Sequence, residues 1–181
     1  KFHRSYNEKK WRILPRQAVY DSSSVTYPVF TAAPAPEVQN KLNGDFSVIA
    51  APYLHNLGAG GCELDYTLTF VGEKFISMVF FGVLDEGEKE IFAKIPFNID
   101  AQAGTRLEIG DVLNLRDTDL LPVLRLLTKK DKVDFSKGVP ESWYYNGTNF
   151  VFCQRSETGE WLEATAAASD LKKFLLRPEL F

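Results

Sequence analysis

The clearest strand pattern of the chain lies between Leu64 and Leu84. Across Leu64–Phe70 every second residue is apolar, which is the period of a strand with one buried face. Gly72–Lys74 gives a turn signal, and a second strand is predicted at Phe75–Leu84, where apolar residues occupy both faces. A strand that is apolar on both faces belongs inside a sheet with structure packed on each side. The pattern therefore predicts that Leu64–Leu84 is the central hairpin of an antiparallel sheet.

Further strands are predicted where short apolar stretches end at turn residues. Two of these stretches contain a proline, Pro28 or Pro96, which removes a ladder donor and indicates an edge strand or a strand with one side partly unpaired. Asn146-Gly147 is a strong hairpin signal, because both turn positions tolerate a positive φ. The predicted strands are Val25–Phe30, Ile91–Ile99, Trp143–Tyr145, Phe150–Cys153 and Glu160–Ala166.

Two stretches show the spacing of an amphipathic helix. The first lies near Glu37–Ala51, and Pro52 is expected to end or kink it. The second lies near Thr118–Lys129, whose lysines suit a helix C-terminus. Their apolar stripes are Val38, Leu42, Phe46 and Ile49 in the first, and Leu120, Leu121, Leu124 and Leu127 in the second. The pattern thus predicts an α+β fold, an antiparallel sheet of four or more strands with these two main helices packed on it.

The 181 residues are enough for one domain with an N-terminal extension. Residues 1–24 are polar without a clear period and are interpreted as a lead-in, and residues 25–181 as a single domain. No apolar run approaches the ~20 residues of a membrane-spanning helix. Because the chain begins with Lys, we expect a processed or truncated product, from which any signal peptide or membrane anchor has already been removed. The net charge of −3 gives no basic surface for nucleic acid.

Cys62 and Cys153 are the two cysteines of the chain. They lack C-x-x-C spacing, so neither a zinc site nor a thioredoxin-type redox site is expected. Two interpretations stay open at this point. The cysteines are free buried thiols, or they form one disulfide that would stabilise the protein by about 4 kcal/mol in an oxidising compartment.

Catalytic chemistry has little support in the residue pattern. The two histidines, His3 and His55, fall in the lead-in and at a helix end, and neither has a second metal ligand at a suitable spacing. A Gly-x-Ser-x-Gly elbow is absent. We therefore expect no enzyme activity, no cofactor and no metal. A pair of carboxylates remains the alternative, because Asp and Glu together number 24 and carboxylates can act as general acid and base.

Three large rings, Trp143, Tyr144 and Tyr145, follow one another on a predicted strand. Successive side chains of a strand point to opposite faces, so at least one ring points away from the buried face. Cross-strand packing is the commoner role for such rings, but Trp and Tyr also dominate binding hot spots. These three residues are therefore the candidate ligand-binding residues.

The order and spacing of five segments resemble a bacterial extracytoplasmic domain found at the C-terminus of the anti-sigma factor RsiV and beside the catalytic domain of the peptidoglycan deacetylase PdaC. The segments are VTYPVF with EVQNKLN, LDYTLTFVGEKFISMVFFG, FNIDAQAGTRLEIGDVL, SWYYNGTNFVFCQ and ASDLKKFL. The third segment matches a family pattern at Asn98, Asp100, Gly104, Leu107, Ile109 and Asp111. A glycine-glycine-alanine-histidine phrase, usual in the family after the central hairpin, has no counterpart in this chain.

The resemblance implies an α+β fold, export across the cytoplasmic membrane, and a sensing or wall-associated role. The leading hypothesis is a non-catalytic, exported bacterial binding module at the cell envelope, whose ligand is a lysozyme-like protein or a glycan such as peptidoglycan. A carboxylate-dependent hydrolase acting on cell-wall polymers is the first alternative. A purely structural spacer domain is the second.

Overall fold

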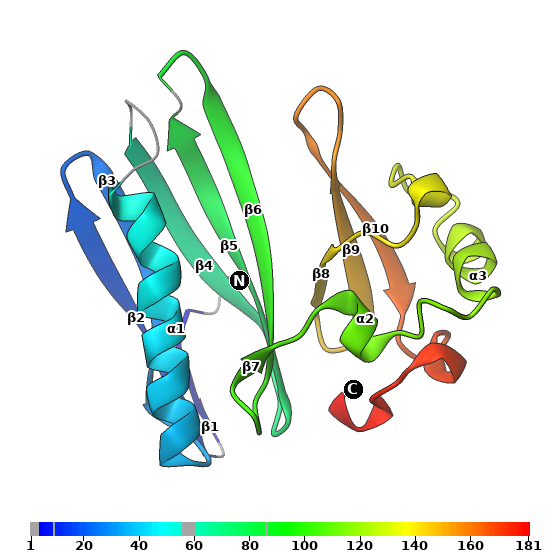
Figure 1. The fold of residues 1–181 in the computed structure, drawn as a ribbon, viewed down its shortest axis with the longest axis horizontal. Coiled ribbons are helices and arrows are strands. Elements are labelled where there is room, and N and C mark those ends of the chain that lie inside the picture. Colours follow the sequence, from blue (N-terminus) through cyan, green and yellow to red (C-terminus); the bar gives the residue numbers. More distant parts are fainter. Residues whose placement is uncertain (1–3, 9, 56–60, 86) are drawn as a thin grey trace.

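The chain folds into two β-sheets with helical segments on their outer faces (Figure 1). The computed structural model describes residues 4–8, 10–55, 61–85 and 87–181. The larger sheet contains β1 (Tyr6–Glu8), β2 (Trp11–Tyr20), β3 (Ser23–Ala32), β4 (Gly61–Val71), β5 (Phe75–Asp85), β6 (Glu90–Asp100) and β7 (Thr105–Arg106), in that order. The smaller sheet contains β8 (Ser142–Tyr145), β9 (Asn149–Arg155) and β10 (Trp161–Ala167), with β9 in the middle.

β4 and β5 form the hairpin predicted from the alternation of apolar residues. They pair antiparallel from Gly61 opposite Asp85 to Val71 opposite Ile76. β5 lies between β4 and β6, and its first six residues are all buried. The prediction of an interior strand with structure packed on each side is therefore confirmed.

β3 and β4 are parallel, and the helix α1 (Pro36–His55) connects them. They share only two residue pairs and then diverge. In the divergent part, Asn43 of α1 accepts a hydrogen bond from Phe30 N at 2.7 Å and donates one to Phe30 O at 2.9 Å. The helix thereby satisfies the backbone of β3 on its β4-facing edge, beyond the two residues that pair with β4. Pro28 lies in the same stretch and is paired on the β2 side alone, as its missing donor requires.

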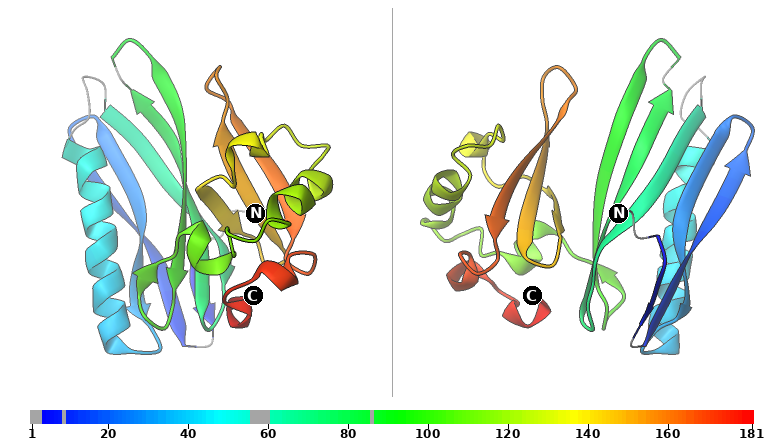
Figure 2. Two further views of the ribbon diagram at one scale, coloured as in Figure 1. Left: turned by 45° about the vertical axis from the view of Figure 1, so that its right-hand side comes forward. Right: turned by 180° about the vertical axis from the view of Figure 1, so that it is seen from behind.

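The molecule is layered (Figures 1 and 2). α1 covers one face of the seven-stranded sheet, and the three-stranded sheet lies on the other side, where it carries its own helical cover. Under α1, the Phe46 ring contacts those of Phe30, Phe80 and Phe97 at centroid distances of 5.2–6.0 Å. The second cover consists of α2 (Ile109–Val112), α3 (Leu120–Leu127) and the 3₁₀ turns η1 (Phe135–Lys137), η2 (Lys172–Phe174) and η3 (Pro178–Leu180).

The prediction of an α+β fold with two main helices on one antiparallel sheet is wrong. The protein is mostly sheet, 48% strand against 20% helix, and the strands form two sheets. The expected helix at Thr118–Lys129 is only α3, and it packs against β10 in the second core. The reason is that the late strands build their own sheet, whose apolar outer face needs a separate cover. The other expected helix is longer than predicted, because α1 continues past Pro52 to His55.

The stretch interpreted as a lead-in, residues 1–24, contains β1 and β2. β2 pairs with β3 along its length, and Trp11 and Ile13 are buried in the core under α1. The Tyr66 hydroxyl of β4 donates to Arg4 O at 2.6 Å, and the Arg4 guanidinium lies 2.6 Å from the Asp65 carboxylate. The described part of this stretch is therefore attached to the seven-stranded sheet.

A buried polar network joins the two sheets. Ser77 Oγ on β5 donates to Asn98 Oδ1 on β6 at 2.7 Å and accepts from Tyr145 N on β8 at 2.9 Å. Asn98 Nδ2 donates to Trp143 O, also on β8, at 2.7 Å. Buried polar groups are stable when each has a partner, so this network fixes β8 against β5 and β6.

Asp100 closes the turn that follows β6. Its carboxylate accepts from the backbone N–H groups of Gln102 and Ala103 and from Arg177, at 2.6 Å for the arginine. Burial opposes the ionisation of Asp100, but these donors outweigh burial and lower the pKa of its carboxyl group. Gly104 then adopts a φ of +65°, which favours glycine. The segment that carries the family resemblance therefore ties β6 to the C-terminal turns.

Candidate functional site

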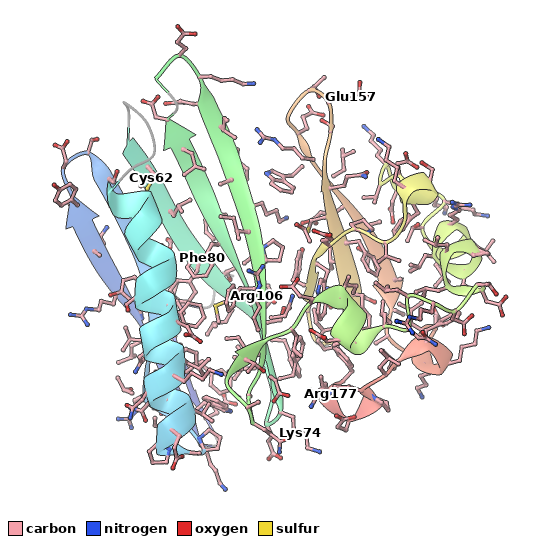
Figure 3. All side chains as sticks on the ribbon, in the orientation of Figure 1. Cys62, Lys74, Phe80, Arg106, Glu157 and Arg177 are labelled. Atoms are coloured by element: carbon pink, nitrogen blue, oxygen red, sulfur yellow. The ribbon has the colours of Figure 1, made fainter. Side chains whose placement is uncertain are left out.

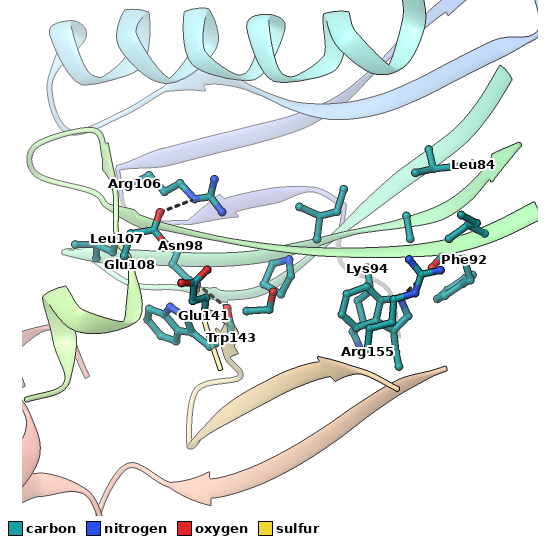
Figure 4. A pocket seen from close by; sticks show the side chains of 16 residues that line it. Leu84, Phe92, Lys94, Asn98, Arg106, Leu107, Glu108, Glu141, Trp143 and Arg155 are labelled. Carbon is teal, nitrogen blue, oxygen red and sulfur yellow. Dashed lines mark hydrogen bonds and ion pairs between the residues drawn. The ribbon is translucent and has the colours of Figure 1, made fainter. Parts of the chain in front are cut away.

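A cleft of about 360 Å³ lies between β6 and the three-stranded sheet (Figure 4). The two sheets contact each other at β8 and diverge toward the turns that join β5 to β6 and β9 to β10 (Figure 1). The lining of the cleft comes from the end of β5, from β6, from β7 and the segment after it, and from the segment before β8 and strands β8 to β10. The residues that define its walls and floor are Phe92, Lys94, Arg155, Trp161, Asn98 and Trp143.

One wall of the cleft is the outer edge of β6. This strand pairs with β5 along all its residues, but with β7 only at Ile99 and Asp100. The rest of its outer edge pairs with no strand among the described residues. Pro96 lies in this part, so the prediction that its strand is only partly paired on one side is confirmed.

The opposite wall carries Arg155 of β9 and Trp161 of β10, which are directly opposed in the strand pairing. Trp161 Nε1 reaches across the cleft and donates to Phe92 O at 2.9 Å. The Phe92 side chain itself is 54% exposed. Arg155 is exposed and forms no ion pair within the described part of the chain. The open end of the cleft therefore offers two aromatic rings and an uncompensated cation.

Lys94 also crosses the cleft, where it pairs with the Glu163 carboxylate. The same carboxylate accepts from the Tyr144 hydroxyl at 3.2 Å, and Lys94 Nζ lies 5.5 Å from the centre of the Tyr144 ring. Burial lowers the pKa of Lys94, although the neighbouring Cys153 acts in the opposite direction. Burial raises the pKa of the Cys153 thiol to about 11 despite Lys94 nearby, so this thiol stays protonated at neutral pH.

The other end of the cleft is mixed in charge. Arg106 pairs with Glu108 at 3.4 Å, and its guanidinium carbon lies 4.8 Å from the centre of the Phe97 ring. Figure 3 labels Arg106 close to where the two sheets approach each other. Glu141 lines the same end and is exposed. The cleft thus runs from a cationic and aromatic end to an end that carries two carboxylates, those of Glu108 and Glu141.

The three rings predicted as ligand-binding residues lie on different sides of their sheet. Trp143 and Tyr145 are 1% and 4% exposed and pack in the second core, where Trp143 stacks on Phe75 with a centroid distance of 6.0 Å. Trp143 also contributes to the floor of the cleft. Tyr144 points the other way, toward Lys94 and the seven-stranded sheet. Two of the three rings therefore have a packing role.

Cys62 and Cys153 are both buried, and neither forms a disulfide. Cys62 lies in a small core with Val25 and Leu64, on the face of the large sheet that α1 covers. Cys153 belongs to β9 of the other sheet. The large sheet separates the two sulfur atoms, so the disulfide alternative is not formed in this structure.

The structure does not describe the side chains of the two histidines weighed for catalysis. His3 lies outside the described residues, and so does the side chain of His55. Among the described residues, there is no cluster of three or more His, Cys, Asp or Glu side chains that could hold a metal ion. Along the same part of the chain, no helix is both long and apolar enough to cross a membrane.

Sequence reasoning missed the residues that line the open end of the cleft. Phe92 and Trp161 fall on strands predicted from periodicity, and Arg155 lies two residues beyond the predicted strand Phe150–Cys153. None of the three belongs to a motif. The signal that could have found them is the exposed face of those strands, because each carries a large or charged side chain at a position of the wet face. Which solvent-exposed strand faces oppose each other depends on how the two sheets pack. The periodicity of the sequence gives no information about that packing.

Comparison with known proteins identifies the fold. No protein-family model matches the chain, and no curated protein sequence does either. A crystal structure of a DUF3298 family protein from Bacteroides fragilis matches with a TM-score of 0.59 at 9% identity, covering 96% of this chain and 95% of that one. A DUF3298 family protein from Pseudomonas aeruginosa matches with a TM-score of 0.56 at 10% identity, covering 96% and 97%. The chain therefore shares its fold with members of a domain family of unknown function.

Proposed function

We propose that this chain, with the fold of DUF3298 proteins, is a non-catalytic binding module that acts outside the cytoplasm at the bacterial cell envelope. The observation that carries the proposal is the cleft between the sheets, with two aromatic rings and the uncompensated Arg155 at its open end. Tryptophan and arginine are enriched in binding hot spots, and Trp161 and Arg155 both line this end of the cleft beside the exposed Phe92 ring. The resemblance to the RsiV and PdaC accessory domains supports the envelope location and a lysozyme-like protein or peptidoglycan as the ligand.

The absence of enzyme activity is part of this proposal. It is supported by the state of the reactive groups near the cleft: Lys94 is held by Glu163, and burial keeps the Cys153 thiol protonated. A nucleophile of either kind needs a free amine or a thiolate. Neither group is therefore available as a nucleophile, which supports ligand binding without catalysis as the role of the cleft.

Retention experiments test the proposal. The purified chain at micromolar concentration is passed over immobilised lysozyme and incubated with insoluble peptidoglycan. We expect retention by one of the two, and a loss of about tenfold or more in Arg155→Glu, because the variant reverses the charge at the open end. Arg16→Glu, on the exposed part of β2, is the control for the change in net charge and should be retained like the wild type. No retention by either ligand contradicts the proposal.

A hydrolase is the second candidate, because Glu108 and Glu141 both line the end of the cleft away from Arg155. Paired carboxylates at such a position could act as acid and base on a wall polymer. Release of soluble muropeptides by the wild type, lost in Glu141→Gln and kept in Glu157→Gln on the exposed β9–β10 turn, would favour the hydrolase over the binding module.

A further inference from the structure

We propose that the cleft binds an extended, acidic segment of a partner polypeptide, which adds a strand to the free edge of β6. This inference rests on the proposed function and deepens it, since it names the ligand as a peptide strand and assigns the atoms that hold it. Strand addition at an open sheet edge is a common mode of peptide recognition, in which backbone hydrogen bonds give affinity and side-chain pockets give specificity.

The hydrogen bonds of β6 show which way its backbone N–H and C=O groups point. Leu107 N donates to Asn98 O at 2.8 Å, and Trp161 Nε1 donates to Phe92 O at 2.9 Å. Both acceptors belong to even-numbered residues, and the pairing of β6 with β5 has no register shift. Backbone groups in an antiparallel pair alternate in direction along the strand. Phe92 and Lys94 therefore turn their N–H and C=O groups outward, away from β5.

The outward backbone groups of Phe92 and Lys94 have no strand partner among the described residues. The chain's own strand β7 pairs with the last two residues of β6 and then leaves the edge. Among the described residues, no strand pairs with the outer edge of β6 between Glu90 and Asn98. The cleft opens along this edge, because its lining includes the consecutive residues Ile91–Pro96. A peptide would therefore continue the line of β7 where that strand ends.

The Trp161 side chain contacts the same edge of β6. Its indole N–H occupies the carbonyl of Phe92, which is the acceptor that a neighbouring strand would use. An unpaired edge also invites association with a second copy of the chain, and proteins commonly protect such edges with charged side chains and prolines. Lys94 and Pro96 act in this way on β6. A peptide that adds to β6 therefore displaces the indole from Phe92 O, whereas the outward N–H groups of Phe92 and Lys94 have no strand partner among the described residues.

The charge of the peptide is inferred from Arg155. Arg155 faces β6 from the opposite wall and has no ion pair among the described residues. Lys94, the other cation at this end, is already held by Glu163. An Asp or Glu side chain on the added strand would pair with Arg155 and exclude water from it. The peptide should therefore carry an acidic residue opposite this position.

Peptide binding measured by NMR and fluorescence anisotropy tests the inference. The probe is a short, blocked peptide of alternating Thr and Val with a central Glu, added up to about 1 mM, which is within reach for weak complexes. We expect saturable shifts of the Phe92 and Lys94 amide signals and slower hydrogen exchange at both. Two further probes carry N-methyl groups on one or the other alternate set of amides. Only one of them should lose binding, because only one set of amides faces β6.

Matched variants assign the binding to the edge. Phe92→Pro removes the outward N–H, whereas Phe92→Thr removes the same ring and keeps the N–H. We expect Phe92→Pro to bind about tenfold more weakly than Phe92→Thr, because the two variants both lack the ring and only the proline lacks the N–H. Arg155→Gln should weaken binding of the Glu peptide and leave a peptide with Gln at that place unchanged, and Arg16→Gln serves as its control. The urea midpoint of each variant shows that it is folded.

Three results would overturn the inference. They are the absence of amide shifts at the highest peptide concentration, equal binding of both N-methylated probes, and equal binding by Phe92→Pro and Phe92→Thr. Self-association that Phe92→Pro abolishes in sedimentation velocity would also overturn it, because the edge would then serve a second copy of the chain. Retention by lysozyme or peptidoglycan without peptide binding leaves the proposed function standing alone. Peptide binding without such retention supports the strand addition and contradicts the envelope ligand.

Discussion

Removal of the Ser77 hydroxyl should open the junction between the two sheets. Ser77→Ala deletes the donor to Asn98 Oδ1 and the acceptor for Tyr145 N at once. Ser77 is fully buried and Asn98 is 3% exposed, so water does not replace the lost partner. The substitution keeps the backbone and removes one oxygen atom, which makes it a sharp test of the network.

The magnitude follows from the groups left without a partner. A buried polar group that loses its hydrogen bond costs about 1–3 kcal/mol, and Ser77→Ala leaves two such groups. We therefore expect a loss of about 2–4 kcal/mol in the free energy of unfolding. Asn98→Ala leaves Trp143 O unpaired and also creates a cavity, so its cost should be similar or larger. The double variant should cost about 1–2 kcal/mol less than the sum, since both changes break the same bond.

Urea unfolding at 25 °C, followed by tryptophan fluorescence, measures these changes. With a slope of about 2 kcal/mol/M, the midpoint of Ser77→Ala should fall by about 1–2 M. Ser47→Ala is the matched control, because its hydroxyl bonds Gly44 O on the exposed face of α1, and it should change stability by less than about 0.5 kcal/mol. Equal midpoints for Ser77→Ala and the wild type, or strict additivity in the double variant, would refute the reasoning.

Three further predictions concern single sites. Gly82→Ala should destabilise the protein by about 3 kcal/mol or more, because a Cβ at this position would overlap the backbone of β4 and because φ is +154°. Thermal unfolding measures the loss of stability, and a midpoint equal to that of the wild type contradicts the prediction. The lowered pKa of Asp100 means that its pairing with Arg177 stabilises the protein above the unfolded value of about 3.9 and is lost as pH falls through the folded value. Asp100→Asn should therefore be less stable by about 1.5–3 kcal/mol at pH 7, and the difference from the wild type should shrink toward pH 3; a constant difference would exclude this linkage. Native Cys153 should react with a thiol reagent at about pH 8 at least a hundredfold slower than in urea, because its thiol is buried with a pKa of about 11; similar rates in both conditions would argue against this burial.

The sequence by itself determined the local structure of this protein. The alternation across Leu64–Phe70 and the turn signal at Gly72–Lys74 predicted the central hairpin. The apolar run from Phe75 predicted burial on both faces, and Asn146-Gly147 marked the turn between β8 and β9. Pro96 indicated the unpaired edge of β6. These features depend on the period of side chains along a strand and on the conformations that Gly and Pro permit, which are properties of neighbouring residues.

Tertiary packing decided the number of layers and the site. Periodicity shows that a strand has a buried face, but it does not say which element covers that face. The late strands therefore could have joined the large sheet, and α3 could have packed beside α1. The same ambiguity assigned three rings to a binding surface, of which Trp143 and Tyr145 pack in a core. Arg155 and Trp161 face β6 only because the two sheets meet at β8 and diverge, and contacts between residues so far apart in sequence are set by the whole packed molecule.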